Sequence, residues 1–138
     1  MLIQLILAAA MVVLTVLILG ASITALVRGL RTRTNGNAEH NHFSLKRALG
    51  ISIIAMALFT PHGIEIWLYG ALYLLIDAVR NLEAAVYYSA MTHGSIGFGG
   101  SEMARPWLLI GAIGAIIGVL LLGWSRAFFV TVVARLPK

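Results

Sequence analysis

The sequence has no cysteine and few charged side chains. The absence of cysteine excludes disulfide bonds, thiol nucleophiles and thiolate-bound metals. Only 11% of the 138 residues are charged, 60% are apolar and the mean hydropathy is +0.94, values that are typical of an integral membrane protein. The ten basic residues give a net charge of +5, but they lie between apolar runs and not along one helical face. Nucleic-acid binding is therefore not expected.

Motifs for catalysis, voltage sensing and coupled transport are also missing. No nucleophile stands beside a base, no carboxylates are paired and no phosphate-binding loop is present, so neither an enzyme nor a bound cofactor is expected. The apolar runs carry no regular ladder of arginines, which argues against a voltage sensor. Inverted repeats of the transporter kind are absent too.

Three apolar runs are long enough to cross a bilayer. We predict an amino-terminal transmembrane helix over residues 1–28, an outer helix over 48–78 and an inner helix over 105–130. Twenty helical residues cover about 30 Å, the thickness of the hydrocarbon core. Segments 29–47 and 131–138 are basic, as cytoplasmic segments of membrane proteins are. The amino terminus is therefore expected outside a cell (inner) membrane and the carboxyl terminus in the cytoplasm.

Polar residues interrupt the second apolar run. Pro61 predicts a kink or local unwinding. His62 and Glu65 are three residues apart and share a helical face, so they are expected to point into the protein. Two interpretations remain open: a polar clasp to a neighbouring helix, or a proton or gating sensor. Trp67, Tyr69 and Tyr73 are expected near the far membrane interface as anchors and packing residues.

A glycine-rich segment lies between the second and third runs. Residues 83–93 predict a helix too short to cross a bilayer, and residues 94–100 follow it with glycines at alternating positions. Such backbone can turn successive carbonyl oxygens the same way. Irregular backbone at membrane depth is tolerated only where protein buries it or where it lines a water-filled path. The pattern predicts a pore helix and an ion filter.

This segment resembles the signature of potassium channels. The family's core of Thr, Val or Leu, Gly, Tyr or Phe, and Gly corresponds without gaps to Ser95, Ile96, Gly97, Phe98 and Gly99. The chain is similar to small prokaryotic channels with two transmembrane helices, a pore loop and an extra amino-terminal helix. The resemblance covers residues 48–126.

The resemblance implies an all-α membrane protein: three transmembrane helices with a re-entrant pore helix and filter loop, assembled as a homotetramer in the lipid bilayer. Carbonyl oxygens of four filter residues would bind potassium ions. Other residues would support the filter or bind cations at its mouth. These sets are, for ion binding, Ser95, Ile96, Gly97 and Phe98 with the adjoining Gly99, and for support, Tyr87, Tyr88, Thr92, His93 and Glu102. For Glu102 a solvated residue at the rim is the alternative. Packing or gating roles for His62, Glu65, Gly114 and Gly118 follow from their positions in the apolar runs and not from the resemblance.

Departures from the family pattern keep other functions open. Gly94 stands where the first threonine is usual, Phe98 lacks the tyrosine hydroxyl and Gly100 replaces an aspartate. A weakly selective or sodium-permeable pore, or a non-conducting membrane scaffold or subunit, are the alternatives to a potassium channel. His93 is either a neutral histidine bonded behind the filter or a group whose protonation adds positive charge near the ions.

Two further patterns have two interpretations each. Gly114 and Gly118 permit close helix packing, and a hinge at either is the alternative. His40 and His42, beside Glu39, could form a weak metal site, but solvated loop histidines are favoured.

Overall fold

The fold is built from helices alone in the part of the chain that is described. A computed structural model describes residues 1–33, 45–94, 96 and 103–134. These residues contain no strand, which confirms the all-α fold class for them. The elements are α1 (Leu2–Arg33), α2 (Leu45–Leu75), α3 (Leu82–His93), the 3-10 turn η1 (Arg105–Trp107) and α4 (Leu108–Ala134).

Three helical segments are long and apolar enough to cross a membrane. They are Leu2–Leu30, Ala48–Leu75 and Arg105–Ala134. At 28 to 30 residues each, they exceed the roughly 20 residues that a hydrocarbon core requires. The described part of the chain therefore has three helices of the kind found in multi-pass membrane proteins.

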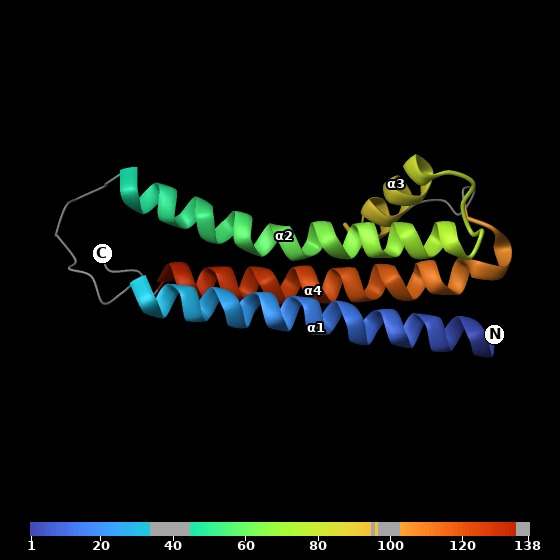
Figure 1. Ribbon diagram of the computed structural model, residues 1–138, viewed down its shortest axis with the longest axis horizontal. Coiled ribbons are helices and arrows are strands. Elements are labelled where there is room, and N and C mark those ends of the chain that lie inside the picture. Colours follow the sequence, from blue (N-terminus) through green and yellow to red (C-terminus); the bar gives the residue numbers. More distant parts are fainter. Residues whose placement is uncertain (34–44, 95, 97–102, 135–138) are drawn as a thin grey trace.

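The three long helices lie side by side, and α3 is packed on one end of the bundle. Figure 1 shows α1 and α4 running in the same direction and α2 running against them. The start of α1, the turn between α2 and α3, and η1 lie at one end of the bundle (Figure 1). The short helix α3 contacts both α2 and α4. Residues far apart in the sequence therefore meet where α3 ends.

The core is a continuous cluster of buried apolar side chains. Exposed apolar residues such as Leu17, Phe59 and Val130 cover the outer surface of the single chain, as expected for helices that contact lipid or other subunits. The cluster draws on all four α-helices and includes Ala8, Met11, Leu19, Tyr69, Tyr73, Ala85, Tyr88, Ile110, Ile117 and Leu121.

Helix α2 continues through its proline and is bent. Pro61 is fully buried inside the helix, and no break is present there, so the predicted local unwinding is not found. Figure 1 shows the amino-terminal part of α2 diverging from α4. A bend of this kind is the usual effect of a proline, which removes one backbone hydrogen bond.

Helix α2 ends in a Schellman motif whose left-handed residue is Asp77. The backbone N–H of Ala78 donates to the carbonyl of Tyr73 (2.8 Å) and that of Asp77 to the carbonyl of Leu74 (3.1 Å). Asp77 has φ of +52°, in the position that glycine usually occupies. The predicted end of this helix at residue 78 is therefore wrong, because the cap stops it at Leu75.

Other predicted helix ends are also displaced. Helix α1 continues to Arg33, whereas its predicted end is residue 28, and α2 begins at Leu45 instead of residue 48. The third span opens with one 3-10 turn and extends to Ala134, past the predicted residue 130. Leucine and arginine are good helix formers. A helix that contains them can therefore extend beyond the apolar run that defines the membrane span.

Helix α3 has a defined start and end. At its start the side chain of Asn81 accepts a hydrogen bond from the backbone N–H of Ala84 (2.8 Å), and Glu83 lies in the first turn. Both features stabilise the positive end of a helix. At its end the N–H of Gly94 donates to the carbonyl of Ala90 (2.9 Å). The helix agrees with the predicted range 83–93 to within one residue.

Glycines of α4 allow α3 and α2 to approach α4 closely. A methyl group at Gly118 would lie 2.7 Å from the carbonyl oxygen and 2.8 Å from the Cα of His93. One at Gly111 would lie 2.7 Å from the hydroxyl of Tyr88, and one at Gly114 would lie 3.0 Å from Tyr69. The packing interpretation of Gly114 and Gly118 agrees with these contacts.

Candidate functional site

The carboxyl end of α3 meets a buried pair of ionisable side chains on α2. His62 and Glu65 are one turn apart, only 4% and 0% exposed, and joined by a contact of 2.9 Å between His62 Nδ1 and Glu65 Oε2. They share a face and point into the protein, as the sequence predicts. Ionisable groups inside a membrane protein are costly unless they are paired, so this pair needs partners from other helices.

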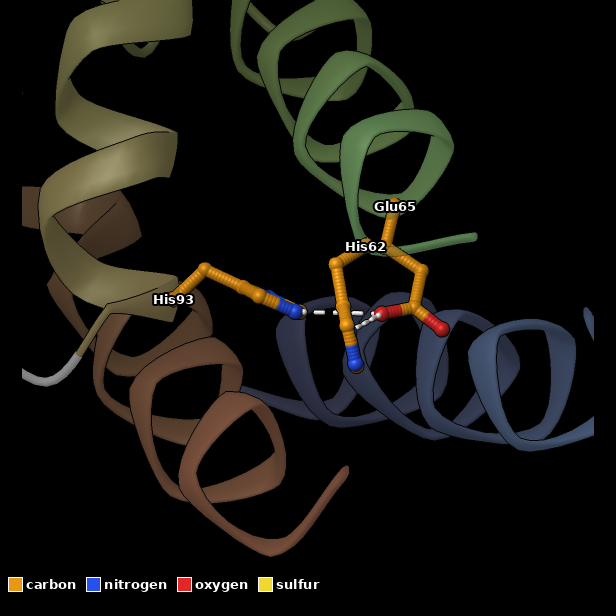
Figure 2. Close-up of side chains that lie close together, drawn as sticks. All are labelled: His62, Glu65 and His93. Atoms are coloured by element: carbon orange, nitrogen blue, oxygen red, sulfur yellow. Dashed lines mark hydrogen bonds and ion pairs between the residues drawn. The ribbon is translucent and has the colours of Figure 1, made fainter. Parts of the chain in front are cut away.

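Two such partners are present. His93, the last residue of α3, places its Nε2 3.1 Å from Glu65 Oε2. Ser125 of α4 places its hydroxyl oxygen 2.9 Å from His62 Nε2. Figure 2 shows His93 approaching from α3 and His62 and Glu65 from α2, with all three side chains directed at one another. The four residues, hereafter the buried polar cluster, connect α2, α3 and α4.

The hydrogen bonds of the buried polar cluster are satisfied by one arrangement of protons. If Glu65 is ionised, its Oε2 accepts from His62 Nδ1–H and from His93 Nε2–H, and the Ser125 hydroxyl donates to His62 Nε2. This arrangement keeps both imidazoles neutral and leaves one negative charge in the interior. Within the described residues, Glu65 Oε1 and His93 Nδ1 have no hydrogen-bond partner although both are buried.

A layer of aromatic side chains packs between this cluster and the end of the bundle. The rings of Tyr69 and His93 are 6.5 Å apart and those of Tyr73 and Tyr88 are 5.6 Å apart, edge to face. Tyr69 and Tyr73 are 2% and 0% exposed. Their packing role is confirmed, and neither ring can serve as an interface anchor because both are enclosed by α3 and α4. Trp67, for which the same role is predicted, is 57% exposed.

One further hydrogen bond joins α3 to α2, and another side chain bonds within α3 itself. The Ser89 hydroxyl donates to the carbonyl of Ile66 on α2 (2.8 Å). The Thr92 hydroxyl donates within α3, to the carbonyls of Tyr88 (2.9 Å) and Ser89 (3.0 Å). Of the predicted support residues, Tyr88, Thr92 and His93 are thus buried against the bundle. Tyr87 is different: it is 53% exposed on the single chain.

Most of the predicted filter lies outside the described residues. Gly94 and Ile96 are described, and Ile96 is 70% exposed; the backbone N–H of Ile96 donates to the carbonyl of Met91 (3.1 Å). The ion-binding prediction for the filter stays a prediction. The predicted residues beyond the description are Ser95, Gly97, Phe98, Gly99 and Glu102, and the pair His40 and His42.

Sequence reasoning did not find Ser125 or the pairing of His93 with Glu65. The sequence pattern places Ser125 only in a Gly-Trp-Ser element near the end of the inner helix, and 63 residues separate it from His62. A polar residue in a strongly apolar span was the one available signal. It cannot specify which of several polar residues on other helices will be the partner.

Comparisons with known proteins do not assign the chain to a family. No protein-family model, no curated protein and no solved structure matches it. The connection to potassium channels is therefore a resemblance in sequence, whose specific part is residues 85–99.

Proposed function

We propose that four copies of the chain form a channel that conducts potassium ions passively through a filter of backbone carbonyl oxygens. The observation that carries this proposal is the depth at which α3 ends. A 12-residue helix begins at one end of the bundle and stops where its last residue meets the middle of two membrane-crossing helices.

The depth follows from the contacts of His93. It meets Gly118, the fourteenth of the 30 residues in the span Arg105–Ala134, and Glu65, ten residues before the end of the span Ala48–Leu75. At about 1.5 Å per residue, both positions lie roughly 15–20 Å from the end of the bundle where α3 begins. The middle of a hydrocarbon core about 30 Å thick falls at this level.

A helix that ends at this depth favours a cation beyond it. The carboxyl end of a helix carries a partial negative charge, and channels for cations use this end of short helices and rings of backbone carbonyls. The glycine-rich residues begin directly at the end of α3, since Gly94 caps the helix. Their sequence supports a carbonyl filter at Ser95, Ile96, Gly97 and Phe98.

The chain also returns to the end of the bundle from which α3 started. The backbone N–H of Ala104 donates to the carbonyl of Ala78 (2.8 Å), which joins the segment before α4 to the turn before α3. Met103 is 3% exposed and packs near Gly111. Fixing both ends of the segment at one level supports a hairpin that enters the membrane from one side and leaves on the same side.

One chain supplies one such hairpin, so a closed path requires several copies. Four copies around an axis would surround an ion with carbonyl oxygens, and closed rotational symmetry is common among homo-oligomers. The exposed apolar faces of the single chain give room for contacts with neighbouring copies and with lipid. The positions of the basic residues favour an amino terminus outside the inner membrane.

Ion flux from liposomes tests the proposal. Purified protein is reconstituted, and flux is measured under a potassium gradient and under a sodium gradient. We expect flux with potassium, little with sodium, and loss of flux in Gly99→Ala, because a side chain would restrict the filter backbone. Gly123→Ala is the matched control: Gly123 has no atom within 4 Å of an added methyl group, so it should conduct like the wild type.

The alternative functions give different results. Equal flux with both ions would replace the selective channel by a weakly selective pore. No flux from correctly folded, reconstituted protein would refute conduction and favour a scaffold or subunit. Flux that persists unchanged in Gly99→Ala would show that ions do not pass through the proposed filter.

A further inference from the structure

The buried polar cluster contains possible metal ligands that the proposed conduction path does not use. Three possible metal ligands, His62, Glu65 and His93, have ligand atoms that all lie within 4.8 Å of one another, and all three side chains are buried. They come from two helices and meet at the level where α3 ends (Figure 2). A clasp between helices needs one hydrogen-bonded pair. Two imidazoles converging on one carboxylate oxygen is the donor set of a metal site.

We propose that His62 Nδ1, Glu65 and His93 Nε2 bind a divalent transition metal ion, with Zn²⁺ as the best match. Imidazole nitrogens suit zinc and related metals, whereas magnesium and calcium prefer oxygen ligands only. Two histidines with one glutamate is an established zinc ligand set that leaves one position for water. The site is formed within a single chain and does not depend on the proposed pore.

The distances in the cluster fit this ion. Zinc binds histidine nitrogen and carboxylate oxygen at about 2.0–2.2 Å in tetrahedral geometry, which separates neighbouring ligand atoms by roughly 3.3 Å. Two of the three separations between ligand atoms are 2.9 Å, from His62 Nδ1 to Glu65 Oε2, and 3.1 Å, from His93 Nε2 to the same oxygen; the third, between the two histidine nitrogens, lies within 4.8 Å. Replacing the two hydrogens between these atoms by one ion requires the side chains to move apart by a few tenths of an ångström.

The unpartnered atoms and the charge of the cluster also favour a cation. Among the described residues, Glu65 Oε1 is buried with no hydrogen-bond partner, and it can act as a second oxygen ligand. The carboxylate would otherwise keep a negative charge in an interior where charge is costly. A bound Zn²⁺ would give this carboxylate a cation as its partner, with the two neutral imidazoles completing the set of protein ligands.

Ser125 has the position of an outer-shell residue in this site. A histidine that binds a metal through one nitrogen usually donates its other N–H to a nearby acceptor, which fixes the orientation of the ring. The Ser125 hydroxyl lies 2.9 Å from His62 Nε2 and can accept such a bond. A zinc ion would thus connect α2 and α3 directly and α4 through Ser125, bracing the end of α3 beside residue 94.

The histidine content of the chain allows a sharp experiment. There are four histidines: His40, His42, His62 and His93. The protein is purified with a tag that contains no histidine, loaded with Zn²⁺ alone, washed with a weak chelator, and its zinc content is measured. We expect roughly one zinc ion per chain in the wild type and also in the double variant His40→Gln, His42→Gln, because a His₂Glu set binds one ion.

Variants of the cluster give the complementary result. His62→Gln with His93→Gln should lose the bound zinc, and Ser125→Ala should weaken zinc affinity by about 10- to 100-fold, as loss of an outer-shell partner does. Zinc should also raise the thermal unfolding midpoint of the wild type, since a ligand that binds the folded state stabilises it. The midpoint of the His62→Gln, His93→Gln variant should not change with zinc.

Two results would overturn the metal site. One is a folded His40→Gln, His42→Gln variant that retains no zinc; this measurement leaves the cluster intact, so it does not depend on whether cluster variants fold. The other is zinc retained at the same stoichiometry by a folded His62→Gln, His93→Gln variant. Neither measurement uses ion flux, so the metal site and the channel can fail independently.

Discussion

Substituting Gly118 by alanine tests the packing of α3 against α4. Gly118 is buried where α4 passes the last residue of α3. An added methyl group would meet the carbonyl oxygen of His93 at 2.7 Å and its Cα at 2.8 Å. Both are backbone atoms, so no flexible side chain can move aside. The end of α3 has to shift away from α4.

The expected cost follows from two opposing effects. Forcing an extra methyl group into a packed interior costs about 1–3 kcal/mol. Alanine is favoured over glycine in a helix interior by about 1 kcal/mol. Gly118→Ala should therefore lose up to about 2 kcal/mol of unfolding free energy. Gly123→Ala, on the same helix but with no atom within 4 Å, should keep the helix-forming gain without the clash.

Thermal unfolding of the two variants in the same detergent provides the measurement. The two free energies should differ by about 1–3 kcal/mol, and for a chain of this size each 1 kcal/mol moves the midpoint by roughly 3–5 °C. We expect Gly118→Ala to unfold several degrees below Gly123→Ala. If Gly118→Ala unfolds at or above the midpoint of Gly123→Ala, α3 does not pack on α4 as described.

Substitutions at Asp77 and Asn81, which lie between α2 and α3, test the helix caps. Asp77→Gly should keep or raise the unfolding midpoint, and Asp77→Val should lose about 1–2 kcal/mol, because a branched side chain is strained at φ of +52°; equal midpoints for the two variants would contradict the left-handed cap. Asn81→Ala should lose about 1 kcal/mol in the same assay, since the N–H of Ala84 loses its acceptor. Asn81→Ser retains an acceptor and should recover most of that loss, so an equally destabilised serine variant would argue against capping.

The sequence predicts the helices well because hydrophobicity over a membrane-length run is a strong signal. The three spans and the short helix after residue 82 are recovered to within a few residues. The ends are less accurate where a local cap decides them. Asp77 ends α2 in a conformation that glycine usually adopts. An aspartate at this position therefore does not predict where the helix ends. Helix α1 continues past its predicted end to Arg33, because helix formers follow the apolar run.

The buried polar cluster shows which part of a site sequence can predict. The spacing of His62 and Glu65 places them on one face, and the cost of charge in lipid directs that face inward; both expectations are met. The partners on other helices depend on how α2, α3 and α4 rotate and slide against one another. Close approach at Gly118 sets that arrangement for His93, and single-sequence patterns do not contain it.

The metal site and the proposed filter share one structural element, the end of α3. His93 binds Glu65 through its side chain and contacts Gly118 through its backbone, while the next residue starts the glycine-rich segment. A shift of this helix end in Gly118→Ala should therefore lower zinc affinity as well as stability. If Gly118→Ala keeps its zinc affinity but loses conduction, α3 and α2 must have moved together as one body. The position of the end of α3 relative to α4 would then control the filter.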